Sequence, residues 1–129
     1  MMITEQICTK EVCLLMEKIM GGTKVDNVGY YSIDGSLHTW NEINFDGECQ
    51  AFTQSVAMRY LREIHNIGVF PGSYTHTMGE VVTHSYGAAI IDLTTHELMT
   101  NECFYSDSFE ESTEQALSYI LIKMNKSYG

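Results

Sequence analysis

Three segments of the chain repeat apolar residues at intervals of three and four positions, the spacing that places side chains on one face of an α-helix. Two of these segments begin at residues that commonly cap helices. Thr9 precedes the first, and Ser108 precedes the last in a capping box with Glu111. The sequence therefore predicts three helices, near residues 9–20, 48–65 and 109–125.

Polar and apolar residues alternate on both sides of the Asp34-Gly35 pair, which is typical of a β-hairpin closed by a two-residue turn. The strands are expected at residues 27–33 and 36–42. In this register Tyr31 faces His38 across the hairpin, and Trp40 follows on the same side of the sheet.

Further strand patterns follow the second predicted helix. A strand is expected at 67–70 and is predicted to stop at Pro71-Gly72. A turn is expected at Met78-Gly79, and a last hairpin over 88–105. These elements predict a small α+β fold in one domain, residues 1–129, in the order α-β-β-α-β-β-β-α, with one strand more or fewer left open. Short connections favour a mainly antiparallel sheet with helices packed on it.

Charge is distributed unevenly along the chain. Seven Lys and Arg oppose 17 Asp and Glu, and no Lys or Arg occurs from Glu63 to Ile122. Such a surface repels a phosphate backbone, so direct nucleic-acid binding is not expected. The acids serve either solubility or contact with a basic partner. The candidate partner-binding residues are Asp92, Glu97, Glu102, Asp107, Glu110, Glu111 and Glu114.

Histidines and cysteines lack the spacing of a metal or catalytic site. No His-Glu-x-x-His or Cys-x-x-Cys motif is present, so we expect no metal, no cofactor and no catalytic residue. His65 is expected to end the second helix as an imidazolium that suits the helix dipole, and His96 to lie in an exposed turn. The cysteines are expected to be reduced and mostly buried: Cys8, Cys13, Cys49 and Cys103.

Aromatic residues are the other candidate feature. The chain contains eight tyrosines and one tryptophan. Tyr31, His38 and Trp40, on one face of the first hairpin, would form a ligand pocket in which flat rings stack on a nucleobase. The alternative is that the rings fill a half-buried sheet, where aromatic residues are favoured.

Three segments together carry a resemblance to a known family. They are "TEQICTKEVCLLMEKI" near the start, "YLREIH" at residues 60–65, and Phe109-Glu110-Glu111 in the last helix. With these segments the chain resembles a family of short proteins encoded by bacteriophages and prophages of gut bacteria. The resemblance covers most of the chain and implies a phage origin and a small α+β fold. It implies no known activity.

The resemblance and the charge lead us to expect a phage accessory protein that acts by binding in the cytoplasm of the host cell, and not an enzyme. The first expectation is a counter-defence inhibitor whose acidic surface binds a basic host protein. The second is a protein that sequesters a nucleotide signal, and the third is a small hydrolase. No apolar run is long enough to span a membrane. A small sheet leaves a free edge, so a homodimer is expected.

Overall fold

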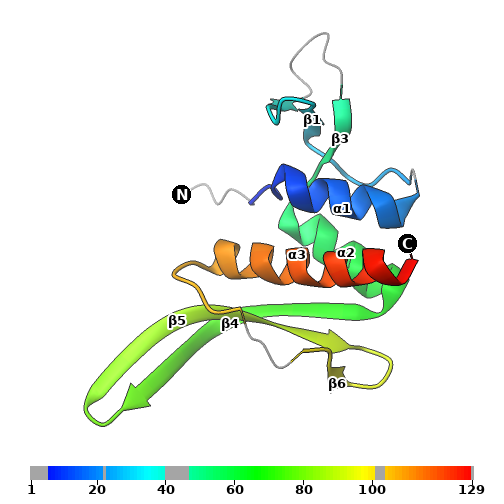
Figure 1. The fold of residues 1–129 in the computed structure, drawn as a ribbon. Helices are drawn as coiled ribbons and strands as arrows, with labels where there is room; N and C mark the ends of the chain where they lie inside the picture. Colours follow the sequence, from blue (N-terminus) through cyan, green and yellow to red (C-terminus); the bar gives the residue numbers. More distant parts are fainter. Residues whose placement is uncertain (1–5, 22, 40–46, 101–103, 129) are drawn as a thin grey trace. The chain divides into compact units, whose positions relative to one another are not determined.

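The computed structural model describes residues 6–21, 23–39, 47–100 and 104–128 (Figure 1). These residues form three helices and two three-stranded antiparallel sheets, which confirms the expected α+β class. The chain divides into two compact units. Unit 1 comprises Met1–Ala57 with Ile120–Gly129, and unit 2 comprises Met58–Tyr119. The expectation of one domain stays a prediction.

Helix α1 (Lys10–Met20) begins and ends where its capping residues predict. The Thr9 hydroxyl accepts from the backbone N–H of Val12 at 3.4 Å. At the other end Gly21 adopts φ 60°, and its N–H donates to Glu17 O at 3.2 Å. The helix buries one face in unit 1, formed by Val12, Cys13, Met16 and Met20.

The sheet of unit 1 has the strand order β2-β1-β3, with β1 at Gly29–Ser32, β2 at Leu37–Thr39 and β3 at Gly47–Ala51. Its β1–β2 hairpin is confirmed, but the expected register is wrong by one position. Ser32 N–H donates to Ser36 O at 3.0 Å, and Gly35, with φ 90°, donates to Ser32 O at 3.0 Å. This is a three-residue loop with a glycine bulge instead of a two-residue turn.

Strand β3 replaces the first part of the second predicted helix. Helix α2 begins only at Gln54 and ends at His65, whereas residues 47–51 pair with β1. The Thr53 hydroxyl accepts from Val56 N at 3.3 Å and so caps the shorter helix. The apolar spacing over 48–53 is compatible with a helix face. Residues 47–51 form a strand instead, because they pair with the free edge of β1.

The sheet of unit 2 has the order β4-β5-β6, with β4 at Ile67–Met78, β5 at Val81–Asp92 and β6 at Glu97–Leu98. The expected stop at Pro71 is wrong, because β4 continues through it and pairs with β5 along its whole length. Proline is tolerated here because β4 is an edge strand and needs no donor on its outer side.

The two turns of this sheet lie where they are expected. Gly79, with φ 62°, opens a two-residue turn between Met78 and Val81. His96 is exposed in the β5–β6 turn with φ 65°. Strand β6 is much shorter than the hairpin predicted over 88–105 requires. Beyond it, Met99 N–H donates to Ile90 O of β5 at 2.9 Å, and Ser106 pairs with Tyr86.

Helix α3 (Phe109–Tyr128) starts at the predicted cap and runs three residues further than expected. Glu111 N–H donates to Ser108 Oγ at 3.0 Å. The buried Ser112 and Thr113 hydroxyls both donate to Phe109 O at 2.9 Å, so their burial leaves no hydroxyl unsatisfied. The apolar face is buried at Ala116, Leu117, Ile120, Leu121 and Met124. Within the described ranges, no helix has the length and apolar character needed to cross a membrane.

Candidate functional site

The expected acidic residues lie in unit 2, and the structure divides them into two groups. Asp92 and Glu97 face each other across the β5–β6 hairpin. The Asp92 carboxylate accepts from Thr94 N at 2.8 Å and from Thr95 N at 3.4 Å. Asp92 therefore stabilises the turn, and Glu97 is the exposed acid of this group.

The second group lies at the start of α3 and is called here the α3 acidic group: Asp107, Glu110, Glu111 and Glu114. Asp107, Glu110 and Glu111 are exposed, and Glu114 is half-buried one turn later. Residues three and four apart share a helix face, so Glu114 lies on the same side as Glu110 and Glu111. Acids in a first helical turn also stabilise the helix through its dipole.

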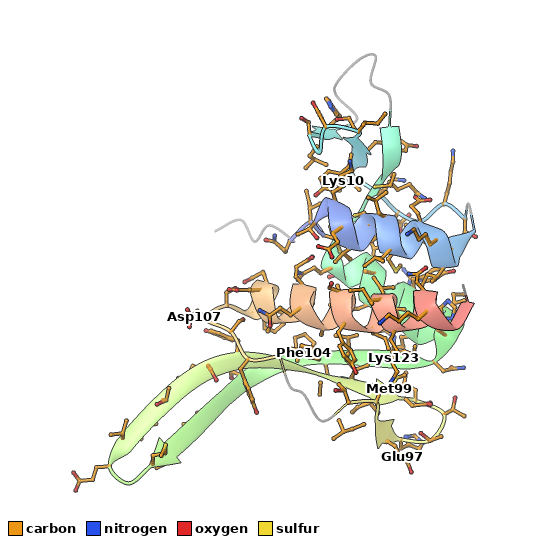
Figure 2. The ribbon with its side chains drawn as sticks, in the orientation of Figure 1. Lys10, Glu97, Met99, Phe104, Asp107 and Lys123 are labelled. Carbon is orange, nitrogen blue, oxygen red and sulfur yellow. The ribbon has the colours of Figure 1, made fainter. Side chains whose placement is uncertain are left out.

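The two groups do not form one continuous surface. Figure 2 shows Glu97 on β6 and Asp107 just before α3, well apart within unit 2. Glu102 lies outside the described residues. Among the described residues of the base-poor stretch, the acids are therefore not one patch, and the start of α3 brings several exposed carboxylates together.

Basic residues in unit 2 are confined to α2. They are Arg59 and Arg62. Arg59 Nε lies 3.1 Å from Glu63 Oε1 in an exposed ion pair one turn apart on the helix. A surface pair of this kind contributes only about 0.3–0.5 kcal/mol, so it matters little for stability.

The ligand pocket expected on one face of the first hairpin does not form as predicted. The register places Tyr30 opposite His38 and Tyr31 opposite Leu37, so Tyr31 and His38 point to different faces of the sheet. The Tyr31 hydroxyl donates to Cys8 O at 2.6 Å. Trp40 lies outside the described residues. The pairing of Tyr31 with His38 in one pocket is therefore wrong.

The thiols are placed as expected where the structure describes them. Cys8, Cys13 and Cys49 are buried cysteines, and Cys103 lies outside the described residues. Among the described residues, no three His, Cys, Asp or Glu side chains gather in a way that could hold a metal ion.

The expectation of a protonated His65 is corrected by its surroundings. His65 does end α2. Its ring lies 5.5 Å from that of Tyr60, and burial lowers the pKa of the imidazole below its usual value. Burial disfavours the charged form of the ring, so the imidazole is neutral at a lower pH than a free histidine.

A feature that the sequence analysis missed is the far half of the β4–β5 hairpin. We call it the distal hairpin and define it as Ser73–Tyr86. Three apolar side chains near its tip are largely exposed, with exposed fractions of 82% for Met78, 65% for Val81 and 64% for Val82. Exposed apolar side chains that cluster in this way are typical of binding surfaces.

A signal for this feature was present in the sequence. From Ile64 to Ile91 the only charged residue is Glu80. In a chain with a net charge of −10, such a neutral stretch marks a segment that can approach another acidic surface. Because a strand end was expected at Pro71, the sequence did not predict a continuous β4–β5 hairpin.

Comparisons of the chain with protein-family models, with curated proteins and with solved structures give no match.

Proposed function

We propose that this protein acts by binding, and that the α3 acidic group contacts a basic surface of another protein. The role we assign to it is that of a phage accessory protein that inhibits a basic host defence factor; the family resemblance supports the phage origin and the acidic charge supports the basic partner. One observation supports the proposal above the others. Asp107, Glu110 and Glu111 expose three carboxylates within five residues, in a unit whose Lys and Arg are limited to two on α2.

The physical basis is electrostatic steering. Like charges held together on a helix end attract a basic surface and speed its encounter with the protein. The attraction extends over a Debye length of about 8 Å at physiological salt, so it weakens as salt is added. A contact of this kind requires no catalytic residue.

The proposal is tested by removing two carboxylates from the α3 acidic group and, in a control, two carboxylates from other elements of the chain. The double variant Glu110→Gln with Glu111→Gln removes two carboxylates from the α3 acidic group. The matched control, Glu11→Gln with Glu97→Gln, removes one carboxylate from the first turn of α1 and one from β6. Both variants change the net charge equally, so solubility and overall charge are balanced.

Tagged wild type and both variants are used to capture proteins from a gut-bacterial lysate at low and high salt. We expect a basic protein that is retained by the wild type and by the control, is lost from the α3 variant, and is released by salt. Equal retention on all three proteins would mean that the α3 acidic group serves only solubility and helix stability.

A further inference from the structure

The outer edge of β4 is open along the distal hairpin. In the described part of the chain the sheet order is β4-β5-β6, and only β5 pairs with β4 (Figure 1). Ser73, Thr75 and Thr77 on this strand are exposed. An isolated two-stranded ribbon is marginally stable in water, so a third strand on this edge would stabilise it.

The direction of the backbone groups on β4 follows from Tyr86. Tyr86 donates to Ser106 O at 3.1 Å and accepts from Ser106 N at 2.8 Å, so its backbone groups face away from β4. Ser73 on β4 and Tyr86 on β5 therefore form a non-hydrogen-bonded pair of the antiparallel ladder. By the two-residue repeat of a strand, the N–H and C=O groups of Ser73, Thr75 and Thr77 all point to the open edge.

Pro71 agrees with this pattern. It shares the parity of Ser73 on β4, so its ring nitrogen faces outward and no hydrogen bond to β5 is lost. Pro71 also ends the open edge on the N-terminal side of Ser73, because proline has no N–H to donate to an additional strand.

The edge lacks the usual protection against pairing. Exposed edge strands commonly carry Lys, another charge or a proline that prevents association. Between Ser73 and Met78 this edge has none of them. The one charge of the distal hairpin is Glu80, in the turn. A second acidic chain can therefore approach here with little repulsion, whereas a basic partner finds nothing to attract it.

We propose that two copies of this protein pair through β4, antiparallel about a two-fold axis at Thr75. In this register Thr75 lies opposite Thr75 of the second copy, and Ser73 opposite Thr77. The three pairs use all the outward N–H and C=O groups from Ser73 to Thr77. The two distal hairpins then form one four-stranded sheet in the order β5-β4-β4-β5.

The residues at both ends of the paired segment favour the register centred on Thr75. It places Met78 opposite Gly72 of the second copy, which pairs in turn with Gly87. The largely exposed Met78 side chain thus lies beside a glycine of the second copy, where no side chain obstructs it. If the register were shifted by two residues, Pro71 would lie in a hydrogen-bonded pair with the second copy. Because proline has no N–H, one hydrogen bond between the two strands would be lost.

Two variants test the edge by their oligomeric state. Thr75→Pro removes an outward N–H, as Pro71 already does without ending β4. Thr75→Lys places two like charges across the two-fold axis. Thr83→Lys is the matched control, because Thr83 is an exposed threonine on β5 of the same hairpin, away from the edge.

We expect light scattering at micromolar to sub-millimolar concentrations to give twice the 14.6 kDa chain mass for the wild type and for Thr83→Lys. Both Thr75 variants should give the mass of one chain while their circular dichroism remains that of the wild type. A wild type that stays monomeric over this range would overturn the proposal and leave the edge to an extended segment of another protein. Dimers that persist in both Thr75 variants would overturn it as well.

A cysteine at the axis tests the register directly. Directly opposite residues in a hydrogen-bonded antiparallel pair have Cα atoms about 5.5 Å apart, which suits a disulfide. Thr75→Cys should therefore give a covalent dimer on mild oxidation, in excess of the wild type with its native cysteines. Thr83→Cys should not. Equal cross-linking at both positions would contradict pairing about Thr75. The inference does not depend on the α3 acidic group.

Discussion

Gln50 on β3 and Glu17 on α1 are joined by two hydrogen bonds to the same carboxylate oxygen. Gln50 Nε2 donates to Glu17 Oε1 at 2.9 Å, and the Gln50 backbone N–H donates to it at 3.2 Å. The Gln50 amide also donates to Thr23 O at 3.1 Å and accepts from Val25 N at 3.1 Å and Asn27 Nδ2 at 3.0 Å. Gln50 is only 5% exposed. It therefore fastens the loop after α1 to the sheet of unit 1.

Replacement of Gln50 by leucine should destabilise the protein. The substitution removes the side-chain hydrogen bonds to Glu17, Thr23 O and Val25 N, although the backbone N–H of residue 50 still reaches Glu17. Unsatisfied buried polar groups of this kind cost about 1–3 kcal/mol of the free energy of unfolding. Chemical denaturation measures the loss. Gln115→Leu, at an exposed position of α3, is the control and should change this free energy by less than about 0.5 kcal/mol. Equal losses in the two variants would contradict the role of Gln50.

Replacement of Tyr31 by phenylalanine tests its inward hydrogen bond. The variant keeps the ring and removes the hydroxyl that donates to Cys8 O. We expect the free energy of unfolding to fall by about 1 kcal/mol, the usual net contribution of one hydrogen bond. If stability were unchanged, the Tyr31 hydroxyl would not anchor β1 to the segment before α1.

Stability should decrease on mild acidification because of His65. Burial lowers the pKa of its imidazole below 6.5, so the unfolded chain takes up this proton at a higher pH than the folded chain. The contribution of neutral His65 is complete above pH 6.5 and is lost as the pH falls through the folded pKa. Between about pH 7.5 and about pH 5.5, His65→Gln should therefore lose less stability than the wild type.

The matched control for His65 is His96→Asn, because asparagine tolerates the positive φ of this exposed turn position. Thermal unfolding across the same pH range measures both variants. The control should keep the pH dependence of the wild type. A wild type whose stability is independent of pH in this range would count against a buried neutral imidazole.

The Asp34 carboxyl should titrate well below an ordinary aspartate. Hydrogen bonds from the Ser32 hydroxyl and from Ser36 N–H lower its pKa from 3.8 to about 2. The contribution of this carboxylate to the loop is complete above pH 3.8 and is lost as the pH falls through about 2. NMR titration of the carboxyl carbon measures the midpoint. Ser32→Ala should raise it toward 3.8, and a wild-type midpoint near 3.8 would contradict the loop geometry.

Features that depend on neighbours in the sequence could be predicted. The caps Thr9 and Ser108 satisfy backbone donors within three residues, so they mark the starts of α1 and α3 without help from the rest of the chain. Gly79 supports a turn because a glycine adopts its positive φ without strain. The class of fold follows from such local signals.

Features that depend on distant partners could not be predicted. The spacing of Cys49 and Phe52 is compatible with a helix, and only the free edge of β1 makes residues 47–51 a strand. Pro71 would stop a central strand, but an edge position lets β4 continue to Met78. The separation of Tyr31 from His38 has a local cause: the three-residue loop shifts the hairpin register by one residue, which turns a side chain to the other face of the sheet. The sequence alone determined where the helices α1 and α3 begin and that the chain turns at Gly79. Only the tertiary structure decided which carboxylates, rings and strand edges lie together, because those positions are set by hydrogen bonds and packing between residues far apart in the chain.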